Sequence, residues 1–174
     1  MNKDIKVVFD LDGVLRNLYS CIRRKFGLQS PAEYHQWDLQ GINIYDLVKR
    51  DYSILERAKP TKYIKTIQDY LSKQSIYDRS IEIWSYQPYD WVQYSSTWIK
   101  KYFPKSVAYW LTPKEKFEKL SKNKDYILID DYPLHKNYHN RLWLIDQPYN
   151  QNVKCEVRIK TVDELRERLK EINK

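Results

Sequence analysis

The stretch VVFDLDGVL, residues 7–15, joins an apolar, strand-like run to two aspartates and a glycine. Asp10 and Asp12 stand one residue apart at the end of the run, and Gly13 follows directly. Because residues i and i+2 of a strand point to the same face, the two carboxylates are expected to converge on one side. Ligands of open α/β sheets bind at the carboxyl ends of the strands, so the stretch predicts a functional site there.

Two neighbouring carboxylates repel each other unless a cation lies between them or one of them is protonated. Mg2+ suits such a pair, because it takes oxygen ligands and leaves room for a phosphate. The calcium-binding EF-hand loop does not fit this stretch. With Asp10 at the first position of that loop, Gly13 comes too early for the required glycine, and Cys21 stands where the last acid should be.

A second acidic pair, Asp130-Asp131, follows another strand-like run, YILI at 126–129, and precedes Pro133. One strand that ends in an aspartate is common. Two strands that each end in an acid pair beside a turn residue are much less expected by chance. The two pairs together predict one metal and phosphate site.

Apolar runs of strand length recur along the chain, at 5–9, 81–84, 107–111, 126–129 and 142–145. Helical patterns separate several of them, at 90–102, 113–121 and 161–173. The helix at 113–121 has a clear start, since Thr112 can cap it and Pro113 fits its first position. Strands that alternate with helices predict an α/β fold with a parallel sheet flanked by helices.

Residues 16–79 differ from the rest of the chain, because they read mainly as helices, at 16–26, 43–57 and 61–74. We therefore predict an α/β core domain formed by residues 1–15 and 80–174. Residues 16–79 are predicted to form a small helical cap inserted after the first motif.

The composition fits a folded chain with anionic partners. The 174 residues are 42% hydrophobic and 15% aromatic, and the net charge of +8 favours phosphates, nucleotides or nucleic acid. Cys21 and Cys155 lie far apart and match no metal spacing, as in a reducing compartment. Without a signal peptide or a membrane-spanning run, we expect a cytoplasmic protein with no membrane partner. The oligomeric state is open, and a homodimer is possible.

The order of these motifs resembles that of the haloacid dehalogenase-like (HAD) phosphohydrolases. The motifs are FDLDGVL at 9–15, a hydrophobic run that ends in Ser85, a lysine on a helix, and ILIDD at 127–131. The run LTPKEKFEKL at 111–120 and the helical insertion are similar to the 5'(3')-deoxyribonucleotidases. The resemblance covers nearly the whole chain and implies a Rossmann-like core.

This resemblance also implies roles for the four acids. Asp10 would be the nucleophile that forms an aspartyl-phosphate, and Asp12 the general acid and base. Asp131 would ligate Mg2+ directly, Asp130 would act through water or orient the site, and the backbone carbonyl of Asp12 would be a further ligand. The metal would bridge Asp10 and a phosphate oxygen. Dehalogenases proper lack the second aspartate, so Asp12 favours phosphoryl transfer.

The other two motifs leave alternatives open. Ser85 is the candidate hydroxyl that binds the phosphate, although a serine after a strand also commonly caps a turn. Lys114, Lys116 and Lys119 compete for the lysine, and a lysine run on a helix is usually a solvated face. We prefer Lys116, because its spacing to IDD is similar to that in bacterial and phage relatives. The shorter spacing of the animal enzymes would favour Lys119.

Residues of the predicted cap could contact a substrate. Tyr19, Tyr34, Trp37 and Tyr45 could stack on a base, although aromatics at helical spacing are more often core residues. Arg16, just past the first motif, could face the phosphate, although surface arginines are common.

The leading functional hypothesis is a Mg2+-dependent phosphatase that hydrolyses nucleoside monophosphates, with deoxyribonucleotides favoured by the resemblance. Alternatives are a phosphatase acting on nucleic-acid 3' ends or on sugar phosphates, and a non-catalytic relative that binds nucleic acid or a protein. Nucleic acid is not the favoured partner, because a sequence cannot show the basic groove that single strands need. The presence of all four acids argues against a silent relative.

Overall fold

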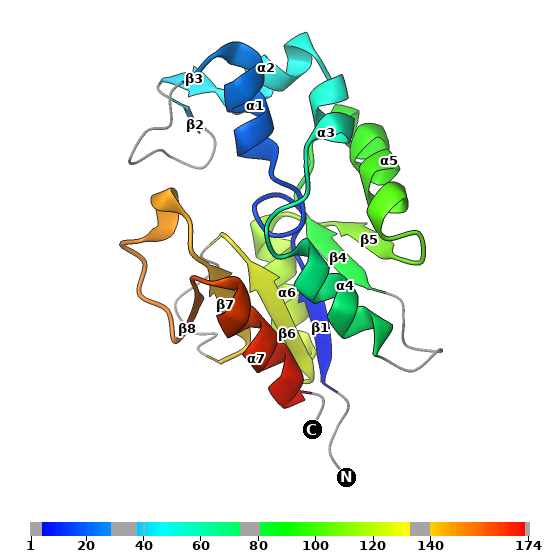
Figure 1. The fold of residues 1–174 in the computed structure, drawn as a ribbon, viewed down its shortest axis with the longest axis vertical. Coiled ribbons are helices and arrows are strands. Elements are labelled where there is room, and N and C mark those ends of the chain that lie inside the picture. Colours follow the sequence, from blue (N-terminus) through cyan, green and yellow to red (C-terminus); the bar gives the residue numbers. More distant parts are fainter. Residues whose placement is uncertain (1–4, 29–37, 40, 74–80, 133–139, 173–174) are drawn as a thin grey trace.

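The computed structural model describes residues 5–28, 38–39, 41–73, 81–132 and 140–172. Its centre is a six-stranded parallel sheet in the order β5-β4-β1-β6-β7-β8 (Figure 1). The strands are β1 (Lys6–Phe9), β4 (Glu82–Ser85), β5 (Val107–Trp110), β6 (Tyr126–Asp130), β7 (Leu142–Ile145) and β8 (Val157–Ile159). This is the order of a Rossmann sheet, in which the chain winds to one side of β1 and then to the other. The α/β fold predicted from the sequence is confirmed, and β8 is added to it.

β1 lies at the centre of the sheet because its side chains are apolar on both faces. Val7 and Phe9 belong to the larger core cluster, and Val8 belongs to a second cluster on the opposite face. Phe9 stands beside Ile129 of β6 and Ile83 of β4 in the parallel pairing. Strands buried on both faces have continuous apolar runs, and Val7-Val8-Phe9 is such a run.

Helices cover both faces of the sheet. The larger core cluster contains side chains from α4 (Ile64–Ser72), α5 (Val92–Tyr102) and α7 (Val162–Ile172). On the other face, α6 (Pro113–Lys122) contributes Leu120. α6 begins as predicted, because the Thr112 hydroxyl accepts a hydrogen bond from the Glu115 backbone and the Glu115 carboxylate accepts one from the Thr112 backbone. This start fixes which side chains of α6 point toward the sheet.

A small helical cap lies above the carboxyl edge of the sheet (Figure 1). It consists of α1 (Leu18–Phe26), α2 (Ile44–Arg50), α3 (Ser53–Arg57) and the antiparallel pair β2 (Asp38–Leu39) and β3 (Ile42–Asn43). The helix predicted over 43–57 is in fact two helices. Asp51 has an extended backbone that ends α2, and its carboxylate accepts a 3.0 Å hydrogen bond from the Ser53 backbone at the start of α3.

The packing of α4 differs from the predicted boundary of the cap at residue 79. Ile67 and Tyr70 of α4 are buried in the core cluster with the sheet, and α4 packs beside α7 (Figure 1). The amphipathic stripe of α4 faces the sheet, so this helix packs with the core although it precedes β4. The chain enters and leaves the cap through two adjacent linkers, since the Asn17 backbone donates to the Lys59 carbonyl at 2.8 Å.

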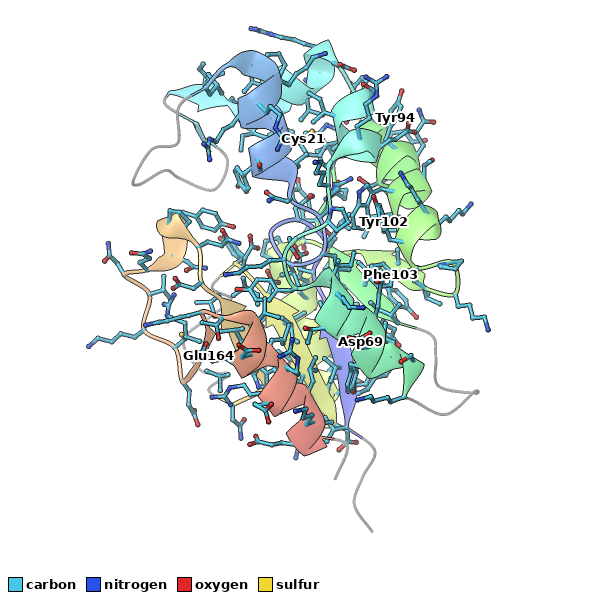
Figure 2. All side chains as sticks on the ribbon, in the orientation of Figure 1. Cys21, Asp69, Tyr94, Tyr102, Phe103 and Glu164 are labelled. Atoms are coloured by element: carbon cyan, nitrogen blue, oxygen red, sulfur yellow. The ribbon has the colours of Figure 1, made fainter. Side chains whose placement is uncertain are left out.

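The cap has its own apolar interior, which Trp91 of the core domain completes. Cys21 lies in this region (Figure 2), with its sulfur 3.9 Å from the carbonyl oxygen of Ile54 in α3. Both Cys21 and Cys155 are free thiols. Among the helices of the described ranges, none combines the length and apolarity that crossing a membrane requires.

Candidate active site

The ends of three adjacent strands bring the predicted site residues together. Asp10 follows β1, Ser85 ends β4, and Asp130 ends β6 with Asp131 next to it. The Asp10 backbone donates a 2.9 Å hydrogen bond to the Ile129 carbonyl, which extends the pairing of β1 with β6 by one residue. This edge is where the winding of the sheet reverses, and such switch points are the ligand sites of open α/β sheets.

Three of the four acids form one buried cluster. Asp10, Asp130 and Asp131 each offer a carboxylate oxygen, and these oxygens lie within 4.8 Å of one another. The three residues are 6%, 0% and 1% exposed, respectively. Carboxylates that are this close together and this well shielded from solvent are stable only with a proton or a cation among them.

Among the described residues, Lys116 is the cation that pairs with this cluster. Its Nζ lies 2.6 Å from Asp10 Oδ1 and 2.8 Å from Asp130 Oδ2, and it is buried. Lys114 is exposed, and Lys119 lies with its Nζ 3.8 Å from the centre of the Tyr109 ring. Among the three lysines left open by the sequence, the geometry therefore places Lys116 at the acids.

The pKa values reflect an excess of negative charge. Burial lowers the pKa of Lys116, but the carboxylates of Asp10 and Asp130 more than offset this and raise it overall, so the ammonium stays charged. Burial raises the pKa of Asp10 to about 7, although Lys116 opposes the shift. Burial also raises the pKa of Asp131 well above its usual range, and the charge of Asp10 adds to this.

The donor set of the cluster fits a divalent hard cation. Its three side chains offer only oxygen, and one lysine cannot neutralise three ionised carboxylates. Mg2+ prefers oxygen ligands and needs few of them from the protein. Asp10 and Asp131 are the residues that would hold such an ion. Asp130 has both oxygens engaged, one by Lys116 and the other by the Tyr132 backbone at 2.9 Å.

The turn after β1 is built around Asp131. Gly13 has a positive φ of +82, and a Cβ there would lie 1.9 Å from Asp131 Oδ2. Glycine is therefore needed both for the backbone conformation and for space. From the loop after β7, the Gln147 side chain donates to the Gly13 carbonyl at 3.1 Å, and the Tyr149 hydroxyl donates to Asp131 Oδ2.

Asp12 stands apart from the three-carboxylate cluster. Arg16 Nε donates to Asp12 Oδ1 at 2.7 Å, and Arg16 Nη2 donates to Oδ2 at 2.8 Å. Gln87 Nε2 also donates to Asp12 Oδ2, at 2.8 Å. Arg16 is 0% exposed and is not among the residues that line the pocket, so it does not face the phosphate position considered from the sequence. It lies behind Asp12 instead.

A pocket of about 110 Å³ opens over these groups. Its polar floor includes Asp10, Asp12, Ser85, Lys116, Asp130 and Asp131, and its walls are formed by Leu18, Tyr19, Ile44, Tyr86, Pro113 and Tyr132. The walls thus come from both the cap and the core, and they are mainly apolar or aromatic.

The cap aromatics named from the sequence have different positions. Tyr19 lines the pocket, and its ring lies 5.6 Å from that of Tyr149. The Tyr45 ring lies 5.1 Å from the ring of Trp91 and is partly buried against the apolar interior of the cap. Tyr34 and Trp37 lie outside the described residues.

Comparisons with known proteins identify the fold. No protein-family model and no curated protein matches the chain. A haloacid dehalogenase-like family hydrolase from Xanthomonas campestris is similar in structure, with a TM-score of 0.51 and 11% identity over 98% of this chain and 97% of that one. A protein from Burkholderia xenovorans LB400, described as a haloacid dehalogenase-like hydrolase, gives a TM-score of 0.52 and 14% identity over 98% of this chain and 99% of that one.

At these identities the likeness concerns the fold. The chain has the α/β fold of these HAD-like hydrolases over nearly its whole length. This confirms the Rossmann-like α/β fold that the resemblance implies. The finer similarity to the 5'(3')-deoxyribonucleotidases stays a prediction.

Proposed function

We propose that this chain is a Mg2+-dependent phosphatase that hydrolyses nucleoside monophosphates, with Asp10 as the nucleophile. The observation that carries the proposal is the buried group of Asp10, Lys116, Asp130 and Asp131 at the floor of the pocket. The HAD-like hydrolases that share the fold support a hydrolytic reaction. Mg2+ held by Asp10 and Asp131 would supply positive charge that offsets the charge of the phosphoryl group in transfer.

The first half of the reaction would be transfer of the phosphoryl group to the protein. A carboxylate oxygen of Asp10 attacks phosphorus, and the bond from phosphorus to the leaving oxygen breaks. Asp12, which also borders the pocket, gives a proton to that oxygen. Lys116 orients Asp10 through their 2.6 Å contact and brings a fixed positive charge to the phosphate.

The second half would release phosphate from Asp10. Asp12, now without its proton, takes a proton from a water molecule that attacks phosphorus. The bond between Asp10 and phosphorus then breaks, which restores both carboxylates. Ser85, buried at the floor of the pocket, would donate a hydrogen bond to a phosphate oxygen in both steps.

The pocket walls favour a nucleoside over a simple sugar as the leaving group. Tyr19 and Ile44 from the cap, with Tyr86 and Tyr132 from the core, offer aromatic and apolar surface above the acids. A planar base gains from such surface, whereas a sugar alone presents mainly hydroxyl groups. The walls therefore support the nucleotide version of the proposal over the sugar-phosphate alternative.

A phosphate-release screen tests the proposal. The substrates are the 5' and 3' nucleoside monophosphates in ribo and deoxy forms, 3'-phosphorylated oligonucleotides and common sugar phosphates, each with Mg2+. We expect the highest kcat/KM for nucleoside monophosphates and no release by the Asp10→Asn variant. A preference for oligonucleotides would favour the nucleic-acid alternative. Equal release by Asp10→Asn and the unchanged protein would refute the assigned mechanism.

A further inference from the structure

A buried polar cluster lies behind Asp12, and it consists of Asp12, Arg16, Gln87 and Ser95. Arg16 and Ser95 are 0% exposed and Gln87 is 6% exposed. A fully buried guanidinium is uncommon and needs partners for its charge and its N–H groups. In this cluster the charge partner is Asp12, the residue proposed as the general acid.

Arg16 holds both oxygens of Asp12 in a two-pronged contact. Its Nε and Nη2 donate to Asp12 Oδ1 and Oδ2, at 2.7 and 2.8 Å. Such forked contacts fix the plane of a carboxylate as well as its position. A lysine could not provide this geometry, because an ammonium is a point charge without a planar fork.

Arg16 is itself fixed by three further contacts. Its Nη1 donates to the Leu55 carbonyl of α3 at 3.0 Å and to Ser95 Oγ of α5 at 3.1 Å. Its Nη2 donates to Gln87 Oε1 at 3.3 Å, and the Ser95 hydroxyl donates to the same oxygen at 2.8 Å. The guanidinium is therefore anchored to the cap through α3 and to the core through α5 and the chain after β4.

The contacts leave Asp12 one direction for chemistry. A carboxylate has about four lone-pair sites, and Arg16 and Gln87 occupy three sites of Asp12. Asp12 borders the pocket, whereas Arg16 and Gln87 do not line it. The remaining lone-pair site of Asp12 is thus available for a proton on the side where a leaving group would lie.

We propose that Arg16 is a positioning residue that orients Asp12 toward the leaving oxygen. The hydrogen bond from Gln87 to Asp12 contributes to the same orientation. Arg16 does not reach the pocket, so it acts through Asp12 and not on the substrate. This inference rests on the proposed phosphatase function, because it gives a role to the acid of that reaction.

The dependence of the rate on the leaving group tests this role. Arg16→Met and Arg16→Lys are compared with the unchanged protein in single-turnover release of the leaving group. The substrates are a nucleoside monophosphate, whose alkoxide needs a proton, and p-nitrophenyl phosphate, whose phenolate does not. We expect about a 10²-fold loss for the nucleoside monophosphate, at the lower end of general acid catalysis, and less than about tenfold for p-nitrophenyl phosphate. The substrate concentration that gives half of the maximal single-turnover rate should stay within about twofold, because substrate contacts are unchanged.

A double-mutant cycle separates positioning from a general loss of structure. In the Asp12→Asn background, adding Arg16→Met should lower the rate of leaving-group release by less than about a further threefold. The reason is that the effects of two residues are not additive when one acts through the other. Arg141→Met is the matched control, because it removes a half-buried arginine that donates to the carbonyls of Leu120 and Asn123, away from the acids. This control should affect both substrates equally and weakly.

Thermal unfolding shows whether the variants fold. Gln87→Met is a second variant that tests the same role. It removes one of the three contacts to Asp12 and should give a smaller loss of rate than Arg16→Met, with the same dependence on the leaving group. Equal losses on both substrates, or an undiminished effect of Arg16→Met in the Asp12→Asn background, would overturn the inference alone. If Arg16→Met and Arg16→Lys do not fold, Gln87→Met decides. An unchanged protein that releases phosphate from neither substrate would overturn the proposed function and the inference with it.

Discussion

Replacement of Asp10 by asparagine should stabilise the metal-free protein at alkaline pH. Asp10 is buried beside Asp130 and Asp131, and burial raises its pKa from 3.8 to about 7. At about 1.4 kcal/mol for each pKa unit, the ionised carboxylate lowers the free energy of unfolding by about 4 kcal/mol. Asparagine has nearly the same shape and no charge, so it removes this cost. The expected gain is up to about 4 kcal/mol, or about 8–16 °C in Tm for a chain of this size.

The sign of the effect follows from proton binding. Between pH 4 and pH 7 the folded state keeps a proton on Asp10 that the unfolded state has lost, at pKa values of about 7 and 3.8. The free energy of unfolding therefore falls as the pH rises through this window. Above it, the full cost is present in the unchanged protein and absent from Asp10→Asn. Below about pH 4, Asp10 is protonated in both the folded and the unfolded state, and the two proteins should differ little. At pH 5 only about a third of the full cost is present.

The assay is thermal unfolding in EDTA at pH 5 and pH 8, for the unchanged protein and for Asp10→Asn. Asp163→Asn is the matched control, because Asp163 is an exposed aspartate, paired with Arg166 on α7. Added Mg2+ should raise the Tm of the unchanged protein more at pH 8 than at pH 5, since the ion neutralises the same charge. Equal Tm values for Asp10→Asn and the unchanged protein at pH 8, or the same gain at both pH values, would refute the reasoning.

Three further predictions concern the same site. Gly13→Ala should lower stability by about 1–3 kcal/mol and reduce phosphate release, because its Cβ would meet Asp131 at a positive φ; an unchanged Tm and rate would contradict this. Lys116→Met should lower the free energy of unfolding by about 3–5 kcal/mol in EDTA, because it leaves buried carboxylates without their cation, whereas the control Lys119→Met should lose only about 1 kcal/mol from its ring contacts. Similar Tm values for the two lysine variants would argue against this assignment. EDTA should abolish phosphate release and Mg2+ should restore it; release that is indifferent to chelation would exclude the metal role of the acid cluster.

Much of the fold could be predicted because its central strands are simple in sequence. The run at 126–129 is continuous and apolar, and the run at 5–9 is interrupted only by Lys6, as expected for strands that are buried on both faces. β8 was missed because Val157–Ile159 is a short edge strand between polar residues, without a recognisable period. The break between α2 and α3 was missed because it depends on one backbone conformation, at Asp51.

The acids of the site could be predicted because each pair is local in sequence and directly follows a strand. Residues that contact these acids from distant parts of the sequence could not be predicted in this way, because no local pattern marks them. Gln87 lies 75 residues from Asp12, and Tyr149 lies 18 residues from Asp131 across a strand and a loop. Arg16 is close in sequence to Asp12, but its burial depends on α3 and α5, which close around it only in the folded structure.

The most direct test of the account is to identify the residue that carries phosphate during the reaction. Asp12→Asn should slow hydrolysis of the intermediate, because the base for the attacking water is lost. This variant is mixed with Mg2+ and p-nitrophenyl phosphate, whose phenolate leaves without a proton from Asp12, and is then quenched in acid, digested and analysed by mass spectrometry. The account predicts a phosphoryl group on Asp10 that is absent from the Asp10→Asn, Asp12→Asn double variant. Phosphate release without a phosphorylated peptide, or a phosphoryl group on another residue, would contradict it.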